Sequence, residues 1–272
     1  MGSPAESVTG LPRALTIAGS DSGGGAGIQA DLKVFFALGC HGTSAVTALT
    51  AQNTVGVTGV HDVPADFVTE QIEAVASDIG IDAAKTGMLS SAEIVTAVAK
   101  AVRAHEIKKL VVDPVFVSKH GSRLLAEDAV EALRSELFPV AALITPNTFE
   151  AGALLGTEVR TLEDVREAAR ELRRFGSRAV LVKGGHLGEE DAIDVFYDGT
   201  AISEIAAPRY DTEDTHGTGC ALSAAICAYL ATGDALPKAV ERGKTFVSGA
   251  IRRSLRLGSG FGPVNPGWEL HR

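Results

Sequence analysis

The stretch DTHGTGC at residues 214–220 places two glycines around a threonine, and a cysteine directly before an apolar run that begins at Ala221. The run predicts a helix, so the glycines lie where the first backbone N–H groups of that helix have no partner within it. Such N–H groups and the helix dipole together bind anions, most often phosphate. A glycine turn before a core helix with a buried thiol is an equally good interpretation of this segment alone, so the rest of the chain has to decide.

The composition sets the scale of the protein. The chain has 272 residues, of which 45% are hydrophobic and 22% charged, enough for one large α/β domain or two small ones with a substantial core. The formal net charge of −9 argues against a nucleic-acid partner, which requires a basic surface. Phosphate-bearing small molecules remain compatible with this charge, because local groups bind them.

The cysteines and the N-terminus bear on the compartment. Cys40, Cys220 and Cys227 have no metal-site spacing and form no even-numbered framework, which is typical of a reducing cytoplasm. Residues 1–11 lack the apolar core of a signal peptide, and no apolar run approaches membrane-spanning length. We therefore expect a soluble, cytoplasmic protein without membrane contact.

Short apolar runs alternate with longer periodic segments along the chain. Strands are predicted at residues 13–18, 44–49, 81–85, 110–113, 142–145 and 179–183, several of them apolar on both faces. Helices are predicted at residues 26–38, 65–77, 91–105, 127–137, 148–155, 162–175, 218–230 and 236–252. The dipeptide Asp198-Gly199 between the segments 192–197 and 201–205 predicts a hairpin.

This order of elements predicts an α/β fold with a doubly wound, mostly parallel central sheet covered by helices on both faces. In such a sheet, ligands bind beyond the C-terminal ends of the strands. No linker, low-complexity tract or internal repeat interrupts the pattern. We therefore expect a single domain over residues 13–272, preceded by a flexible N-terminus at residues 1–12.

The first strand leads into a second glycine-rich stretch, GSDSGGGAG at residues 19–27. Its five glycines in nine positions exceed what a strand-to-helix turn needs, so we expect its backbone to approach a ligand closely. The stretch fits neither the dinucleotide pattern GxGxxG nor the P-loop, which ends in lysine and a hydroxyl residue.

Asp31 stands on the apolar face of the helix that follows. Its spacing places it with Ile28, Leu32 and Phe35 on one helical side. An acid on an apolar stripe is costly to bury unless it is paired or hydrogen-bonded. A partly exposed stripe edge would also explain it, but we expect Asp31 to face a polar pocket.

Two further residues near strand ends could contact a flat ring. Gln52 carries both a donor and an acceptor, which can pair with the edge of a heterocycle. An ordinary turn is nevertheless the better interpretation of that segment alone. Met88 either flanks a ring or fills the core, and the core is the better default.

Three segments carry charges after apolar strands. A carboxylate at Asp113 can orient Mg²⁺ or its waters. Asn147 and Glu150 lie on one side of a first helical turn, where a helix cap is the simpler interpretation. Lys183 precedes two glycines and either meets a nucleotide phosphate as a point charge or is a solvated turn residue.

In their order and spacing, these segments closely resemble the hydroxymethylpyrimidine/phosphomethylpyrimidine kinases of thiamin biosynthesis, within the ribokinase-like superfamily. The matching segments are ALTIAGSDSGGGAGIQAD (14–31), TALTAQNT (47–54), KTGML (85–89), VDPV (112–115), ITPNTFE (144–150), KGGH (183–186) and HGTGC (216–220). The resemblance covers residues 14–266 and implies a ribokinase-like fold. It also implies an enzyme that uses ATP and Mg²⁺ to phosphorylate 4-amino-5-hydroxymethyl-2-methylpyrimidine and then its monophosphate.

The resemblance further implies roles for individual residues. The pyrimidine would be surrounded by Gly19, Asp31, Gln52 and Met88. Mg²⁺ would be organised by Asp113 and Glu150. The nucleotide would be contacted by Lys183, Asn147 and Thr215. The anion hole for the transferred phosphoryl group would be formed by Gly217, Thr218, Gly219 and Cys220. Residues 116–121 resemble the mobile flap of the family, and the resemblance suggests a homodimer.

Cys220 occupies the position at which many ribokinase-like sugar kinases carry an aspartate base. An unperturbed thiol has a pKa of ~8.5, and half-ionisation at pH 7 requires a pKa roughly 1.5 lower, about the most that a helix N-terminus supplies. A loose phosphoryl-transfer transition state depends more on positioning and charge neutralisation than on a strong base. We therefore expect Cys220 to assist deprotonation without being the main source of rate.

Other functions remain open at this point. A pyridoxal kinase of the same superfamily also binds a flat heterocycle that bears a CH₂OH group. A catalytically inactive ligand-binding or regulatory protein could keep the pocket without the reaction, although Asp113, Glu150, Lys183 and the glycine loop argue against it. A sugar kinase fits less well, because the aspartate base is missing and Gln52 suits a heterocycle.

Overall fold

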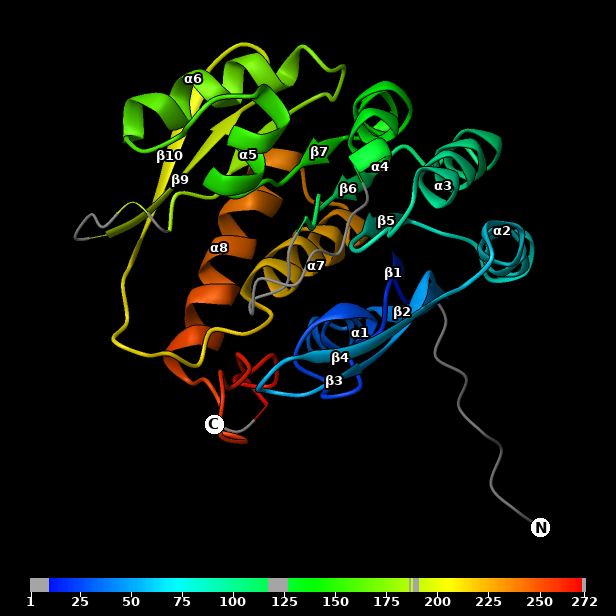
Figure 1. Ribbon diagram of the computed structural model, residues 1–272, viewed down its shortest axis with the longest axis horizontal. Helices are drawn as coiled ribbons and strands as arrows, with labels where there is room; N and C mark the ends of the chain where they lie inside the picture. Colours follow the sequence, from blue (N-terminus) through cyan, green and yellow to red (C-terminus); the bar gives the residue numbers. More distant parts are fainter. Residues whose placement is uncertain (1–9, 117–126, 186, 188–190, 271–272) are drawn as a thin grey trace.

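A computed structural model describes residues 10–116, 127–185, 187 and 191–270. Its centre is a sheet with the strand order β10-β9-β8-β7-β6-β5-β1-β2 (Figure 1). These strands are β1 (Arg13–Ala18), β2 (His41–Val46), β5 (Ala83–Thr86), β6 (Leu110–Val112), β7 (Leu143–Ile144), β8 (Val180–Val182), β9 (Asp191–Tyr197) and β10 (Ile202–Pro208). Neighbours from β2 to β8 pair in parallel, whereas β8, β9 and β10 pair antiparallel, which confirms the predicted mostly parallel sheet and the hairpin.

Helices cover both faces of this sheet (Figure 1). The helices are α1 (Gly27–Ala37), α2 (Ala65–Ala74), α3 (Ala92–Ala104), α4 (Glu127–Ala132), α5 (Thr148–Leu155), α6 (Leu162–Arg173), α7 (Thr218–Ala231) and α8 (Leu236–Arg252), and the short turns are η1 (Val75–Ile79), η2 (Leu133–Leu137) and η3 (Phe138–Val140). One core lies between the sheet and helices α2 to α6, and the other lies between the sheet and α1, α7 and α8. The doubly wound architecture predicted from the sequence is therefore confirmed.

The strand predicted at residues 44–49 is divided in the structure between two strands of different sheets, β2 and β3 (Ala48–Gln52). The chain leaves the main sheet after β2, and β3 pairs with β4 (Val57–Asp62) in a separate two-stranded sheet. The break falls at the buried Thr47, whose N–H donates to the carbonyl oxygen of Ala18 at 3.0 Å and whose hydroxyl donates to that of Met88 at 2.6 Å. β4 was not predicted, because its side chains are largely exposed and lack an apolar alternation.

A row of polar side chains, here called the polar row, lies near the C-terminal ends of the parallel strands: Thr16, Lys85, Asp113, Thr145 and Lys183. Each follows by two positions a residue of the core beneath α7, respectively Ala14, Ala83, Val111, Leu143 and Leu181. Alternate residues of a strand point to the same face of the sheet. The residues of the polar row therefore lie on the same face of the sheet as the core beneath α7, nearer to the C-terminal ends of the strands. The N-terminus of α7 lies at this end of the sheet.

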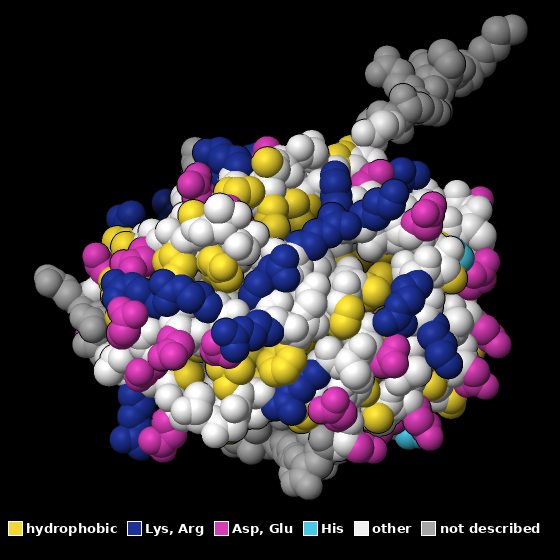
Figure 2. Space-filling view, turned by 90° about the horizontal axis from the view of Figure 1, so that it is seen from above, with side chains coloured by type: hydrophobic (Ala, Val, Ile, Leu, Met, Phe, Trp, Pro, Cys, Tyr) yellow, Lys and Arg dark blue, Asp and Glu magenta, His cyan; other side chains and the backbone are white. Residues whose placement is uncertain are grey.

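The surface carries charges of both signs. On the face seen in Figure 2, Lys and Arg side chains are interspersed with Asp and Glu side chains. Among the described residues, no helix combines the length and the apolar character needed to cross a membrane. The absence of a nucleic-acid partner stays a prediction.

Candidate active site

The N-terminus of α7 is built by glycine. Gly217 is the residue that caps the helix, with a φ of +79°, and a Cβ atom there would overlap the carbonyl oxygen of Gly25. The first turn of α7 contains no acidic side chain, and no side chain caps its N–H groups. Thr218 donates its hydroxyl proton backwards to the carbonyl oxygen of Thr215 at 2.8 Å. The helix start thus presents backbone amides with a favourable dipole for an anion, as the sequence predicted.

Two carboxylates and a lysine converge beside this helix start, and we call them the acid–lysine cluster: Asp113, Glu150 and Lys183. The Lys183 Nζ atom lies 2.7 Å from Asp113 Oδ1 and 3.9 Å from Glu150 Oε2. A Cβ atom on Gly219 would lie 3.2 Å from that Nζ atom and 3.6 Å from Asp113 Oδ2, so only glycine leaves the space open. Burial alone would lower the pKa of Lys183, but the neighbouring Asp113 and Glu150 outweigh it and raise the pKa, which keeps the ammonium charged.

Asn147 and Glu150 form the helix cap that the sequence indicates. They form a capping box at α5: Asn147 Oδ1 accepts the Glu150 N–H at 2.8 Å, and Glu150 Oε2 accepts the Asn147 N–H at 2.8 Å. The same Glu150 side chain belongs to the acid–lysine cluster. Burial raises the pKa of Glu150 to about 7, and Asp113 adds to this increase while Lys183 opposes it. An additional cation at this point would therefore be favourable, because it would compensate two buried carboxylates.

The residues predicted around the pyrimidine do not all reach an open surface. A Cβ atom on Gly19 would lie 3.1 Å from the Met88 sulfur, so this glycine allows the half-buried Met88 to approach the loop. Gln52 at the end of β3 is also half-buried, and its amide nitrogen lies 3.5 Å from Nε2 of His216. Gly19 and Met88 thus lie side by side, and Gln52 lies beside His216; that these residues surround a pyrimidine stays a prediction.

Asp31 differs from the expectation that it faces a polar pocket. Its side chain is fully buried, and Oδ2 accepts from Lys85 Nζ at 2.7 Å and from the Thr16 hydroxyl at 2.6 Å. The other oxygen, Oδ1, is buried and has no hydrogen-bond partner within the part of the chain that the structure describes. Asp31 is therefore the counterion of Lys85 beneath the pocket. Its contact with a pyrimidine stays a prediction.

Cys220 lies near both lysines of the polar row. Burial raises the pKa of its thiol to about 11; Lys85 lowers it, but Asp31 and Asp113 raise it further. A hydrogen bond from the Gly27 N–H also favours the thiolate, but it does not compensate the burial. The helix N-terminus therefore does not bring this thiol towards ionisation at neutral pH, contrary to the effect considered from the sequence.

No role was predicted from the sequence for Lys85, Asp21 or His216. Lys85 is fully buried, and burial lowers its pKa while Asp31 and the other nearby anions raise it more strongly, so it stays charged. Asp21 Oδ2 lies 2.9 Å from Nε2 of His216 across two different loops. Both pairs join residues that are distant in sequence, and only the charge of Lys85 at a strand end signalled a polar environment.

Thr215 and the flap have different outcomes. The N–H of the half-buried Thr215 donates to the carbonyl oxygen of Glu213 at 2.8 Å, and its carbonyl oxygen holds the Thr218 hydroxyl. Thr215 therefore shapes the start of α7, and its contact with a nucleotide stays a prediction.

Of the predicted flap at residues 116–121, only Phe116 lies within the described residues. In the KGGH segment, Lys183 lies within the described residues and His186 lies outside them.

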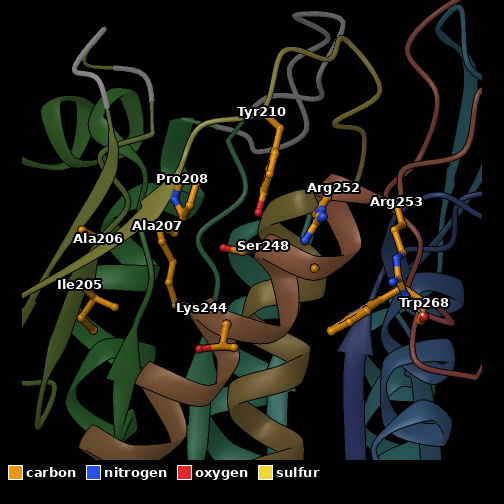
Figure 3. Close-up of a pocket in the computed structure, with 12 residues that line it drawn as sticks. Ile205, Ala206, Ala207, Pro208, Tyr210, Lys244, Ser248, Arg252, Arg253 and Trp268 are labelled. Atoms are coloured by element: carbon orange, nitrogen blue, oxygen red, sulfur yellow. Dashed lines mark hydrogen bonds between the residues drawn. The ribbon is translucent and has the colours of Figure 1, made fainter. Parts of the chain in front are cut away.

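A hollow of about 300 Å³ lies between β10 and α8. Figure 3 shows Tyr210 extending over α8 from the segment after β10, with Ser248 and Arg252 on the helix surface nearby. Lys244 lines the hollow and contacts Asp194 Oδ2 at 2.7 Å, and Asp194 Oδ1 accepts the N–H of Gly184 at 3.1 Å. One buried ion pair therefore joins this hollow to the loop that carries Lys183.

Known proteins are similar to this chain in both sequence and fold. The chain matches the model of the phosphomethylpyrimidine kinase family over residues 21–265. It is similar to a hydroxymethylpyrimidine/phosphomethylpyrimidine kinase of Streptomyces coelicolor, with 51% identity over 259 residues that cover 95% of this chain and 96% of that protein. A thiamine biosynthesis bifunctional protein of Geobacter sulfurreducens is 52% identical over 251 residues, which cover 92% of this chain but only 51% of that relative's length.

Solved structures agree with this grouping. A pyridoxal kinase of Bacillus subtilis in complex with ADP superposes with a TM-score of 0.91 at 38% identity, over 97% of this chain and 100% of that chain. A phosphomethylpyrimidine kinase of Clostridium difficile superposes with a TM-score of 0.78 at 43% identity, over 88% and 99% of the two chains. These similarities confirm the ribokinase-like fold predicted from the sequence. The chain belongs to the phosphomethylpyrimidine kinase family.

Proposed function

We propose that this protein is a kinase that transfers the γ-phosphoryl group of ATP to 4-amino-5-hydroxymethyl-2-methylpyrimidine and then to the resulting monophosphate. In the first reaction the hydroxymethyl oxygen bonds to the γ-phosphorus, the bond from that phosphorus to ADP breaks, and the hydroxyl proton is released. In the second reaction an oxygen of the monophosphate takes the place of the hydroxyl oxygen. Relatives named hydroxymethylpyrimidine/phosphomethylpyrimidine kinase, which are 51% and 45% identical to this chain, support the assignment.

The observation that carries the proposal is the acid–lysine cluster beside the glycine-capped start of α7. Phosphoryl transfer depends mainly on positioning and on charges placed around the moving group. A Cβ atom placed on Gly219 would lie 3.2 Å from Lys183 Nζ and 3.6 Å from Asp113 Oδ2, so a group bound beside this glycine would contact both side chains. A γ-phosphate beside Gly219 would meet backbone amides on one side and the Lys183 ammonium on the other.

The acceptor would lie on the other side of α7, against Gly19, Met88 and Gln52. The Met88 sulfur offers a polarisable contact to an aromatic ring. The Gln52 amide offers a donor and an acceptor to an aminopyrimidine edge. Asp31 and Lys85 support this region from below, as a buried ion pair at 2.7 Å.

We assign the nucleotide base to the hollow between β10 and α8. Tyr210 and Pro208 supply apolar surface there, and Ser248 and Lys244 supply polar groups. The ion pair of Lys244 with Asp194 leads from this hollow to Gly184, next to Lys183. The ADP complex of the similar Bacillus subtilis pyridoxal kinase supports the use of an adenine nucleotide.

The acid–lysine cluster also fits Mg²⁺. The two carboxylates, Asp113 and Glu150, lie 2.7 and 3.9 Å from the Lys183 Nζ atom, so they are close enough to each other to share a cation or its waters. The described residues contain no group of three or more His, Cys, Asp and Glu side chains suited to a metal. Mg²⁺ commonly takes one or two carboxylates and completes its shell with water and substrate phosphates. When bound, it would neutralise charge on the nucleotide phosphates.

The test is the identification of the products formed from ATP and the hydroxymethylpyrimidine, with and without Mg²⁺, by phosphorus NMR. The proposal predicts a monophosphate that gives way to a diphosphate, both dependent on Mg²⁺. Pyridoxal is the competing acceptor, because solved pyridoxal kinases superpose closely on this chain. If kcat/KM is higher for pyridoxal than for the pyrimidine, pyridoxal is the acceptor. If ATP is consumed with neither of the two acceptors present, both assignments are refuted only when adding either acceptor produces no phosphorylated product.

We also propose that the protein is a cytoplasmic homodimer with one kinase domain over residues 13–272. Sedimentation velocity on the purified chain tests the dimer, and a single unfolding transition in calorimetry tests the single domain.

A further inference from the structure

Two loops that are distant in the sequence interlock behind the candidate site: residues 19–27, here called loop 1, and residues 214–220, here called loop 2. A Cβ atom on Gly217 of loop 2 would overlap the carbonyl oxygen of Gly25 in loop 1. A Cβ atom on Gly25 would lie 2.5 Å from Cδ2 of the His216 ring. The two loops are therefore already in close contact at these glycines. An attractive interaction between the loops would then fix their relative position.

Asp21 gives loop 1 its shape. Its side chain is 3% exposed, and its Oδ1 atom accepts the N–H of Gly23 at 2.8 Å. Its Oδ2 atom accepts the N–H groups of Gly25 at 3.0 Å and Ala26 at 2.8 Å. Burial opposes ionisation of this carboxyl, but the hydrogen bonds from His216 and from these amides outweigh it and lower the pKa of Asp21.

The same Oδ2 atom crosses to loop 2, where His216 Nε2 lies 2.9 Å away. The His216 side chain is 7% exposed, so the pair is shielded from water. An ionised carboxylate can only accept hydrogen bonds, so His216 carries a proton on Nε2 and donates it to Asp21. Hydrogen bonds with one charged partner are among the stronger ones in proteins.

The backbone of His216 is fixed as well. Its N–H donates to the carbonyl oxygen of Gly262 at 3.0 Å, and its carbonyl oxygen accepts the N–H of Val264 at 3.0 Å. The ring lies 3.5 Å from the Gln52 amide nitrogen.

We propose that Asp21 and His216 are a positioning pair, which sets the distance between the acceptor hydroxyl and the phosphate-binding amides of loop 2. The inference rests on the proposed kinase function. Loop 1 carries Gly19 on the acceptor side, and loop 2 carries Gly217 to Cys220 on the phosphate side. Asp21 and His216 bind each other and the backbone of loop 1, so the pair would act through the two loops.

The first test compares His216→Phe, which keeps ring volume and removes the donor, with His216→Gln, whose amide can again donate to Asp21. A misplacement of 1 Å costs about 10²-fold in rate, so His216→Phe should lower kcat about 10²-fold. The KM values for ATP and for the pyrimidine should change by less than about threefold, because each half of the site stays intact. His216→Gln should restore kcat to within about tenfold of the unaltered chain, since only part of the geometry is lost.

The matched control is His105→Phe. His105 Nε2 also contacts a carboxylate, Glu73 Oε2 at 2.7 Å, but at the C-terminal end of α3. This variant should leave kcat unchanged. The proposal is overturned if His216→Phe keeps the unaltered kcat, if it raises KM alone, or if His216→Gln is as slow as His216→Phe.

A second measurement tests the coupling of the loops without any turnover. Asp21→Asn changes only loop 1, yet it should increase amide hydrogen exchange in peptides that contain loop 2, at unchanged exchange in α3. Unchanged exchange in loop 2 would overturn the proposal. This measurement does not depend on His216→Phe, so it decides the question even if that variant fails to fold. If the unaltered chain phosphorylates neither acceptor but the exchange rises as expected, the proposed function fails while the coupling holds.

Discussion

At the scale of single residues, Cys220 is the side chain whose role the structure alters most. Burial raises the pKa of its thiol to about 11, so the thiolate is scarce at neutral pH. Bound ATP would add negative charge nearby and disfavour the thiolate further. In the proposed reaction, the rate then comes mainly from the amides of α7 and from the acid–lysine cluster.

We predict that Cys220→Ala retains measurable turnover, with a loss of about 10- to 10³-fold in kcat, the range of a general-base contribution. Cys220→Asp should retain activity as well, because a carboxylate there accepts the hydroxyl proton. Steady-state kinetics on both variants measure this. A loss in Cys220→Ala as complete as that caused by removing Mg²⁺ would refute the prediction.

A second prediction concerns the reactivity of this thiol. Because its pKa lies above the ordinary value, the folded protein keeps the proton at pH 8, and the alkylation rate should continue to rise up to about pH 11. The measurement is the iodoacetamide rate at Cys220 by mass spectrometry, with Cys220→Ala as the control for the buried Cys40 and Cys227. A rate that levels off below pH 8 would contradict it.

At the scale of elements, the ion pair between α1 and β5 matters most for stability. Asp31 and Lys85 are both fully buried, at 2.7 Å. We predict that Lys85→Met lowers the free energy of unfolding by about 3–5 kcal/mol, because it leaves Asp31 buried without its counterion. The double variant Asp31→Leu with Lys85→Met should be more stable than Lys85→Met alone, since no charge is left unpaired.

Urea unfolding of the unaltered chain, Lys85→Met and the double variant tests this prediction. Lys100→Met is the matched control, because Lys100 is exposed on α3 and should change stability by less than about 0.5 kcal/mol. Equal loss in the single and the double variant would show that packing, not charge pairing, is responsible.

The hollow between β10 and α8 leads to a prediction on nucleotide affinity. Ser248 is half-buried on the helix surface that lines the hollow, so Ser248→Phe should fill the space assigned to the base. We expect the KM for ATP to rise by about tenfold or more, which corresponds to roughly 1.4 kcal/mol of lost binding, while the KM for the pyrimidine stays unchanged. An equal rise in both KM values would place the base elsewhere.

The elements also show what the sequence could predict. The bounds of α5 and α8 agree with the prediction, because a capping box starts α5 and a proline stands in the first turn of α8. The two-stranded sheet β3–β4 was not predicted, because its break at Thr47 depends on hydrogen bonds to Ala18 and Met88, which lie elsewhere in the chain. Local patterns contain the caps and the apolar rows but not such tertiary contacts.

The same division applies to the site. The rule that ligand groups follow strand ends located Asp113 and Lys183, and the structure brings both to the start of α7. The partners of Asp31 and His216 could not be predicted, because the pairs span 54 and 195 positions of sequence. A buried charge indicates that a partner exists, but only the fold identifies it.

At the scale of the whole molecule, the proposed nucleotide site spans both halves of the chain, from Asp113 to Ser248. A ligand that binds only the folded state stabilises all of it, by about 2.7 kcal/mol at a hundred times its Kd. We therefore predict that ADP with Mg²⁺ raises the melting temperature of the unaltered chain, measured by calorimetry. Lys183→Met should show a smaller increase, and an equal increase in both would argue against a phosphate contact at Lys183.

The pair that joins Asp21 to His216 has a consequence for protein synthesis. Its two members are separated by 195 positions, and β1 pairs with β5 only after the intervening β2, β3 and β4 have been made. A ribosome that adds about 5–20 residues per second needs roughly 10–40 seconds between the two codons. During that interval loop 1 has no counterpart, so the contact between Asp21 and His216 can form only after loop 2 has been made.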